Sequence, residues 1–101
     1  MRDMTAGQIT TWALAELERR HYFVWRNNNL SVPGRKFIGI KGVPDIVGFV
    51  KNSGLAVYCE VKTVNDKFSE YQSNFLNRAK TAGCICLIAC EENGRLQLNQ
   101  W

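Results

Sequence analysis

Residues 42–62 place two acids at the polar ends of neighbouring strand-like segments, and this arrangement limits the folds open to the chain. Asp45 begins one apolar run, and Glu60 and Lys62 lie near the end of the next. Side chains alternate between the faces of a strand, so Glu60 and Lys62 point the same way as Tyr58. Charged groups among apolar neighbours are costly to bury unless they are paired or bind a ligand. The sequence therefore predicts that charged side chains with a functional role gather at one end of the sheet.

The loop between these two segments determines how they pair. Residues 51–54 read Lys-Asn-Ser-Gly, which is typical of a hairpin loop, so residues 45–50 and 55–62 are predicted to be antiparallel. If Val50 pairs with Leu55 across this loop, the register places Asp45 opposite Glu60. Directly opposed side chains have Cβ atoms roughly 4.5–5.5 Å apart. Two carboxylates at that distance repel each other, and a divalent cation between them would remove the penalty.

The remaining segments predict one small α/β domain over residues 1–101, a mixed sheet flanked by helices. Residues 5–20 and 69–82 carry apolar side chains at helical spacing, and Thr5 and Ser69 are candidate N-caps. The strand–helix–strand unit that ends near residue 90 favours a parallel crossover. Further strands are expected at residues 21–26, 35–41, 84–90 and 95–100.

Gln72 has two roles that the sequence leaves open. The run Ser69-Glu70-Tyr71-Gln72 matches a capping box, in which the Gln72 side chain closes the start of the helix. The same amide can instead reach Glu60 and Lys62, and the two roles compete for it. Gln72 is the only polar member of a stripe that otherwise comprises Phe68, Tyr71, Phe75, Leu76 and Ala79.

Basic residues are expected to gather beside the sheet. The segments at 21–26 and 35–41 flank a turn signal at residues 31–34 and are predicted to form a hairpin. That hairpin would bring together Arg26, Arg35, Lys36 and Lys41. The net charge of +4 agrees with nucleic-acid binding, but a slight positive balance is also common in plain soluble domains.

Four cysteines are present without the spacing of a zinc site or a favourable disulfide geometry. They are Cys59, Cys84, Cys86 and Cys90. The sequence favours small buried residues in a reducing compartment. No signal peptide is visible, and no apolar run approaches the roughly 20 residues of a membrane span, so a cytoplasmic protein without a membrane partner is expected.

The order of these motifs resembles the PD-(D/E)XK nuclease superfamily and, within it, the VRR-NUC group of virus-type replication-repair nucleases. The likeness rests on WRNNN, KGVPDIVGF, YCEVKT, the S-x-x-Q that opens the second helix, and AGCICLIA, in this order. It extends over about residues 8–90. The resemblance implies a restriction-endonuclease-like fold and a phosphodiesterase that acts on DNA with Mg²⁺ or Mn²⁺ and with no organic cofactor.

The resemblance also implies a role for each motif residue. Asp45 and Glu60 would ligate the metal, together with the backbone carbonyl of Val61. Lys62 would position or activate the attacking water, and Gln72 would support the site from the helix. Such a ligand set suits Mg²⁺, which takes oxygen ligands and retains several waters.

One part of the family pattern is missing from the first helix. Members commonly carry a further acid about one turn before Ile9, where residues 5–8 of this chain contain none. Asp3 lies just upstream and Glu16 two turns downstream, and either could substitute. Glu16 can equally lie at the edge of the apolar stripe and reach water, so the number of metal ions stays open.

Size and resemblance together predict a structure-selective DNA endonuclease. A domain of 101 residues would select its substrate by itself or as a homodimer, whose two-fold axis suits symmetric cutting of a four-way junction. Small members of the group, often of phage or prophage origin, look like Holliday-junction resolvases of bacterial or phage-infected cells; a DNA flap is another possible substrate. Two alternatives remain: a DNA-binding module that has lost catalysis, and an ordinary domain whose Asp45, Glu60 and Lys62 form a surface ion cluster.

Overall fold

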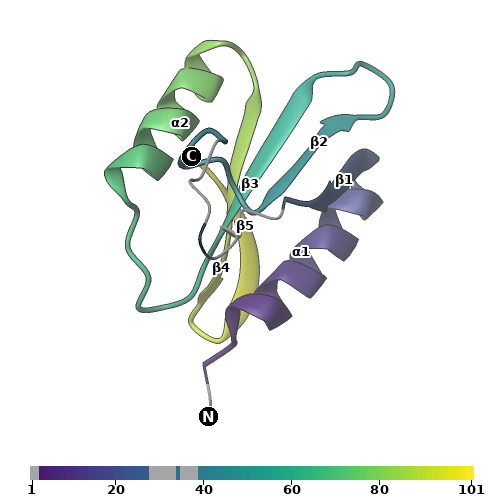
Figure 1. Ribbon diagram of the computed structural model, residues 1–101. Helices are drawn as coiled ribbons and strands as arrows, with labels where there is room; N and C mark the ends of the chain where they lie inside the picture. The colour runs from purple at the N-terminus through teal and green to yellow at the C-terminus, as the bar shows by residue number, and fades with distance from the viewer. Residues whose placement is uncertain (1–2, 28–33, 35–38) are drawn as a thin grey trace.

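Five strands and two helices make up the described part of this computed structural model, which covers residues 3–27, 34 and 39–101 (Figure 1). In chain order they are α1 (Ala6–Arg19), β1 (Tyr22–Arg26), β2 (Ile46–Val50), β3 (Ala56–Lys62), α2 (Glu70–Thr81), β4 (Ile85–Glu92) and β5 (Arg95–Gln100). The strands form one sheet in the order β1-β2-β3-β4-β5. Only the β3–β4 pair is parallel, and the other three pairs are antiparallel. The mixed sheet with its strand–helix–strand crossover is therefore confirmed.

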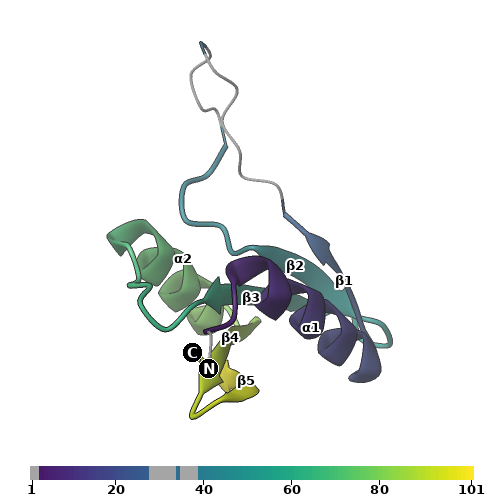
Figure 2. The same cartoon turned by 90° about the horizontal axis from the view of Figure 1, so that it is seen from below.

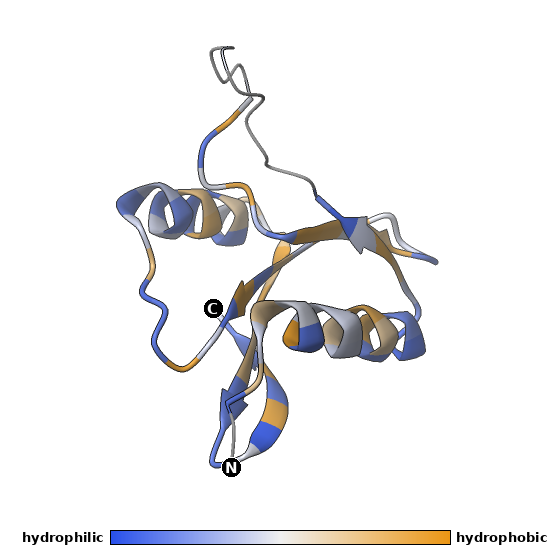
Figure 3. Ribbon diagram, turned by 60° about the horizontal axis from the view of Figure 1, so that its bottom comes forward, coloured by the Kyte–Doolittle hydropathy of each residue, from blue (hydrophilic) through white to orange (hydrophobic). Residues whose placement is uncertain are grey.

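The two helices cover opposite faces of the sheet (Figures 1 and 2). The core under α1 contains Ile9, Ala13, Leu17, Ile46, Cys59, Val61, Leu87 and Ala89. The smaller core under α2 contains Leu76, Ala79 and Cys86, with Tyr58, Phe68, Phe75, Cys84 and Trp101 packed against it. Both helices carry hydrophilic and hydrophobic residues side by side, as one-sided packing requires (Figure 3). Alternate residues of β3 thus face different helices, as the period-two reading of that strand predicts.

Both helices begin where the capping signals place them. Thr5 Oγ1 accepts a hydrogen bond from the Gln8 N–H, and Gln8 Oε1 accepts one from the Thr5 N–H. Ser69 and Gln72 form the same reciprocal pair at the start of α2. Each capping box satisfies backbone donors that a helix start otherwise leaves without a partner. Gly83, whose φ is 94°, follows the end of α2.

Residues 39–41 do not form a strand, so this end of the predicted 35–41 strand is wrong. The aromatic strand β1 pairs with β2 instead, with Trp25 opposite Val47. Residues 40–42 run against α2, where Gly42 packs so closely on the helix that an added Cβ would lie 2.3 Å from the backbone oxygen of Tyr71. The rest of the predicted strand, with Arg35 and Lys36, lies outside the described residues.

Tyr71 is a second correction, because it does not belong to the buried stripe of α2. Its side chain is 56% exposed, and the Lys41 ammonium lies 5.0 Å from the centre of its ring. The helix packs on β4 with Leu76 and Ala79, whereas Tyr71 lines a groove with Ile40 and Lys41. Helical spacing alone does not reveal how far the buried stripe of a helix extends around its surface.

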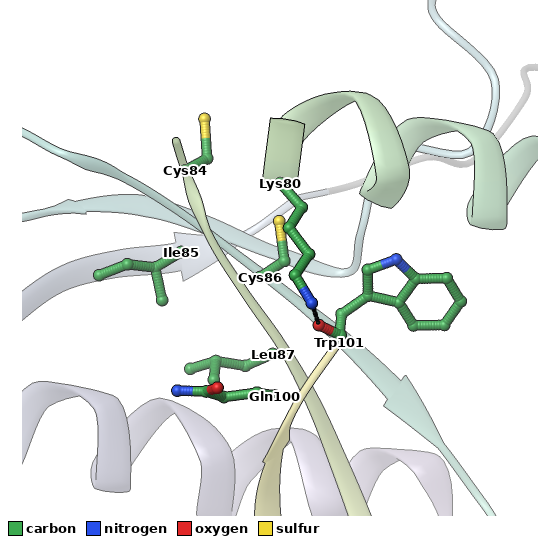
Figure 4. A pocket seen from close by; sticks show the side chains of 7 residues that line it. All are labelled: Lys80, Cys84, Ile85, Cys86, Leu87, Gln100 and Trp101. Carbon is green, nitrogen blue, oxygen red and sulfur yellow. Dashed lines mark hydrogen bonds between the residues drawn. The ribbon is translucent and has the colours of Figure 1, made fainter. Parts of the chain in front are cut away.

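The end of the described chain fastens α2 to the sheet. The Trp101 indole N–H donates to Asn77 Oδ1 at 2.9 Å, and the indole packs on Phe68 with ring centroids 4.9 Å apart. Lys80 Nζ donates to the backbone oxygen of Trp101 (Figure 4). These contacts border a cavity of about 200 Å³ between the end of α2 and strands β4 and β5. Packing on Trp101 thus fixes the position of Phe68, which approaches the candidate site.

All four cysteines are free thiols. Cys59 and Cys86 are buried, whereas Cys84 and Cys90 are only partly buried. Burial raises the pKa of the Cys59 thiol to about 12, so that thiol stays protonated and unreactive at neutral pH. Across the described residues, no helix has the length and apolar character needed to cross a membrane.

Candidate active site

The β2–β3 hairpin brings Asp45 and Glu60 to the same end of the sheet. Ile46 pairs with Cys59, so the residues just beyond this pair continue the register and place Asp45 opposite Glu60, as predicted. Asp45 Oδ2 also accepts a hydrogen bond of 3.0 Å from the backbone N–H of Val61. This bond ties the Asp45 side chain to the backbone of β3, beside the carboxyl of Glu60.

Glu60 is buried, and one of its two carboxyl oxygens has no hydrogen-bond partner. Its side chain belongs to a residue that is 2% exposed, and Oε2 is the one buried side-chain oxygen or nitrogen among the described residues that has no partner. Burial, reinforced by the neighbouring Asp45 carboxyl, raises the pKa of Glu60 to about 9, although the Lys62 charge opposes part of this increase. On its own, Glu60 therefore holds a proton at neutral pH. A cation at this position would replace that proton.

The Lys62 ammonium is held on the same face of β3 by three groups. Nζ donates to the backbone oxygen of Lys67 at 3.0 Å and to Gln72 Oε1 at 2.8 Å. It also lies 4.6 Å from the centre of the Phe68 ring, where the negative face of the aromatic system attracts a cation. Lys62 is only 9% exposed, so these contacts fix the ammonium at the sheet end beside Glu60.

Gln72 fills both of the roles that the sequence leaves open. Its Oε1 atom accepts from the Ser69 N–H at 2.9 Å and from Lys62 Nζ at 2.8 Å. An amide oxygen has two lone pairs, so the cap and the active-site contact do not compete. The first turn of α2 is thus coupled directly to the position of Lys62.

Two residues that hold Lys62 are absent from the predicted site. Lys67 contributes its backbone oxygen. Every residue type has such an oxygen, so the sequence does not indicate this contact. Phe68 is predicted only as an apolar member of the α2 stripe, yet its ring also faces the ammonium. A signal for Phe68 was available in the sequence, because it directly precedes the capping box that carries Gln72.

Neither candidate substitute for the missing first-helix acid joins the site. Glu16 forms an ion pair of 3.3 Å with Arg19, on the helix that covers the opposite face of the sheet. Asp3 is exposed ahead of α1. No cluster of three or more His, Cys, Asp or Glu side chains suited to a metal occurs in the part of the chain that the structure describes.

Among the described residues, Asp45 and Glu60 supply the two carboxyls at this end of the sheet. Asp66, whose charge also acts on Glu60 and Lys62, lies in the loop after β3 and accepts a hydrogen bond from the Thr63 N–H.

The predicted basic cluster is described only in part. Arg26 is exposed at the end of β1, where it pairs with Ile46, and the neighbouring Asn27 N–H donates to the backbone oxygen of Asp45 at 2.7 Å. Lys41 lies over Tyr71 of α2. Arg26 shares a sheet face with its partner Ile46, which belongs to the core under α1, so its side chain leaves the sheet on the face opposite to Glu60.

Comparison with known proteins agrees with this arrangement. The VRR-NUC domain family model matches residues 35–90. Hjc, a Holliday junction resolvase from the archaeal hyperthermophile Archaeoglobus fulgidus, has a similar structure with a TM-score of 0.61 at 18% identity, over 93% of this chain and 75% of Hjc. A solved VRR-NUC domain gives a TM-score of 0.56 at 24% identity, over 84% of each chain. No curated protein matches the chain. The restriction-endonuclease-like fold is thus confirmed.

Proposed function

The chain belongs to the VRR-NUC domain family, and from this membership and the site geometry we propose that it is a metal-dependent endonuclease that cleaves branched DNA as a homodimeric Holliday-junction resolvase. The observation that carries the proposal is the buried, unpartnered Oε2 of Glu60 opposite Asp45, with the Lys62 ammonium on the same strand face. A surface ion cluster would be solvated, whereas Glu60 is 2% exposed.

The oxygen atoms at the sheet end fit a hard divalent cation, Mg²⁺ or Mn²⁺. Asp45, Glu60 and the backbone carbonyl of Val61 would hold it, and the buried Oε2 of Glu60 would gain the partner that it lacks. A bound cation of this kind polarises a phosphate and lowers the pKa of a coordinated water. Asp45 is already oriented for this role by its hydrogen bond from the Val61 N–H.

In this proposal Lys62 acts on the water or on the phosphate. An ammonium has three donors, and two of them are used by Lys67 and Gln72. The third remains for the attacking water or for a phosphate oxygen that gains negative charge during the reaction. Because Lys67 and Gln72 hold the Lys62 ammonium in place, it needs to move little when the substrate binds.

Branched DNA is the proposed substrate because the similar structure of Hjc is that of a Holliday junction resolvase. Symmetric cutting of a four-way junction requires two sites, and a two-fold homodimer supplies them. An exposed aromatic face on β1 and β2, formed by Phe23, Trp25 and Phe49, supports dimerisation. The free cysteines support a reducing compartment such as the cytoplasm of a bacterial or phage-infected cell.

Cleavage of a labelled four-way junction with Mg²⁺ tests the proposal, with linear duplex, flap and single-stranded DNA as controls. We expect paired symmetric nicks by the wild type and none by Asp45→Asn or Lys62→Ala. Equal cutting of all four substrates, or no cutting of the junction, would reject the resolvase proposal.

The first helix favours a second candidate function. It lacks the acid that the family commonly carries, and Glu16 faces away from the site in an ion pair with Arg19. A DNA-binding module without catalysis is therefore the alternative. Tight junction binding with no cutting in either Mg²⁺ or Mn²⁺ would support it.

A further inference from the structure

A groove of about 560 Å³ lies between α2 and the segment at residues 40–41. Ile40 and Lys41 form one wall, and the other comprises Tyr71, Asn74, Phe75 and Arg78 with Asn77 beside them. Residues three or four apart share one face of a helix, so these α2 side chains form a continuous row. The row combines the polar side chains of Asn74 and Arg78 with the aromatic rings of Tyr71 and Phe75, so it does not suit a purely apolar ligand.

Positive charge collects in this groove. Both ion pairs of the described residues involve glutamates of α1, and neither Lys41 nor Arg78 pairs with a described carboxylate. The single acid of α2 is Glu70, in its first turn. The Tyr71 ring holds the Lys41 ammonium at 5.0 Å without neutralising its charge. The α2 side thus presents unpaired cations, whereas both glutamates of α1 are in ion pairs.

The groove and the candidate catalytic centre are built on the same two segments, α2 and the chain that leads from residue 40 to Asp45. Gly42, with a φ of 86°, carries the chain across the start of α2 and leads to Asp45 three residues later. Gln72, which holds the active-site lysine, lies in the first turn of the same helix. Arg78 is six residues further along, about 9 Å at 1.5 Å per residue. One strand of a DNA duplex advances about 3.4 Å of helix axis per phosphate, so this distance spans two to three phosphates.

We propose that this groove binds the sugar–phosphate backbone of one DNA strand, two to three phosphates from the bond that is cut. Arg78 contacts a phosphate through its planar guanidinium, and Lys41 contributes a point charge. Asn74 donates to a phosphate or sugar oxygen, which positions the strand without reading its sequence. The inference rests on the proposed nuclease function, and it extends DNA recognition from the expected basic residues to the outer face of α2.

Equilibrium binding of a fluorescent four-way junction tests the groove, in an Asp45→Asn background that removes cleavage. Arg78→Ala and Lys41→Ala each remove one charge from it, and Arg19→Ala removes one charge from α1 as the matched control. We expect each groove variant to weaken binding about tenfold and to reduce the slope of log K against log salt by about 1. Arg19→Ala should leave both quantities near those of the parent. Arg78→Lys should restore the salt slope but only part of the affinity.

Folding and function are separated by two further measurements. Arg78 is exposed, so circular dichroism and thermal melting of its variants should match the parent. Asn74→Asp, which adds a negative charge to the groove, should weaken binding more than Asn74→Ala.

If the wild type cuts the junction but the groove variants bind as Arg19→Ala does, the groove inference is wrong and the nuclease proposal stands. If the wild type neither binds nor cuts any DNA, the nuclease proposal itself fails.

Discussion

The Lys62 ammonium donates a hydrogen bond of 2.8 Å to the same Gln72 oxygen that accepts from the Ser69 N–H. One atom thus closes the start of α2 and fixes the lysine beside Glu60. A side chain with a single role at the helix start could be replaced by another capping residue. Gln72 has a second partner in the site, so its loss has consequences for both stability and chemistry.

Replacing Gln72 with alanine should therefore lower both stability and cleavage. The free energy of unfolding should fall by about 1 kcal/mol, which is typical for the loss of a helix cap. The rate of junction cleavage should fall about tenfold to a hundredfold, because Lys62 loses an acceptor that positions it. Urea unfolding and single-turnover cleavage measure the two effects.

Ser69→Ala is the matched control for this prediction. It removes the hydroxyl that accepts from the Gln72 N–H, but leaves the Gln72 side chain bound to Lys62. Its stability should fall by a similar amount while its cleavage rate stays close to wild type. Equal loss of cleavage in both variants would mean that the helix start matters and the contact to Lys62 does not.

The hairpin at the site was predictable because a short loop leaves little choice of register. A loop over residues 51–54 sets the pairing of the two strands, and period-two alternation then assigns each side chain to a face. The capping box gave the start of α2 for a similar local reason. These parts of the site depend on residues that are close in sequence.

The parts that sequence reasoning missed depend on tertiary placement. The backbone oxygen of Lys67 has no signature in the residue type. Tyr71 is exposed beside a groove, and that groove follows from the path of residues 40–42. The pairing of β1 with β2 joins segments separated by a long connection, which a strand-like pattern at residues 35–41 obscured.

Stability of the metal-free protein should fall as the pH rises. Glu60 has a pKa of about 9 in the folded chain and an ordinary value of 4.5. Between these values the folded state keeps a proton that the unfolded state has lost, so the free energy of unfolding decreases with increasing pH. Urea unfolding with EDTA at intervals from pH 5 to pH 9 measures this slope. Glu60→Gln should flatten it and should be more stable than wild type at pH 8.

Divalent cations should act against this trend. Binding of Mg²⁺ at Asp45 and Glu60 requires the Glu60 carboxylate, so it should release a proton, and the affinity should rise with pH. Calorimetric titration in two buffers of different ionisation enthalpy measures the released proton. At a Mg²⁺ concentration about 100 times the dissociation constant, the protein should gain about 2.7 kcal/mol of stability.

Asp45→Asn provides the control for metal binding. It keeps an oxygen that can accept from the Val61 N–H, but removes one charge from the site. The Mg²⁺-dependent stabilisation should disappear in this variant while the fold is retained. Equal stabilisation of Asp45→Asn and wild type would show that Mg²⁺ binds elsewhere on the protein.

The aromatic face of β1 and β2 should determine the oligomeric state. Phe23 stacks on Phe49 with ring centroids 5.3 Å apart and meets Trp25 edge-on at 5.9 Å, and all three rings are exposed on a part of the sheet that the core under α2 does not include. Contiguous exposed apolar surface of this kind marks interaction sites. Light scattering after size-exclusion chromatography should give a dimer for wild type and a monomer for Trp25→Glu.

Val64→Ser is the matched control for the aromatic face, since Val64 is an exposed apolar residue in the loop after β3. This variant should remain dimeric. A monomeric Trp25→Glu should also lose paired nicking of the junction, because one protomer presents a single site to two symmetric strands. A monomeric wild type would contradict the proposed homodimer. A dimer that Trp25→Glu leaves intact would show that this face is not the interface and would direct attention to β5, the other edge strand of the described sheet.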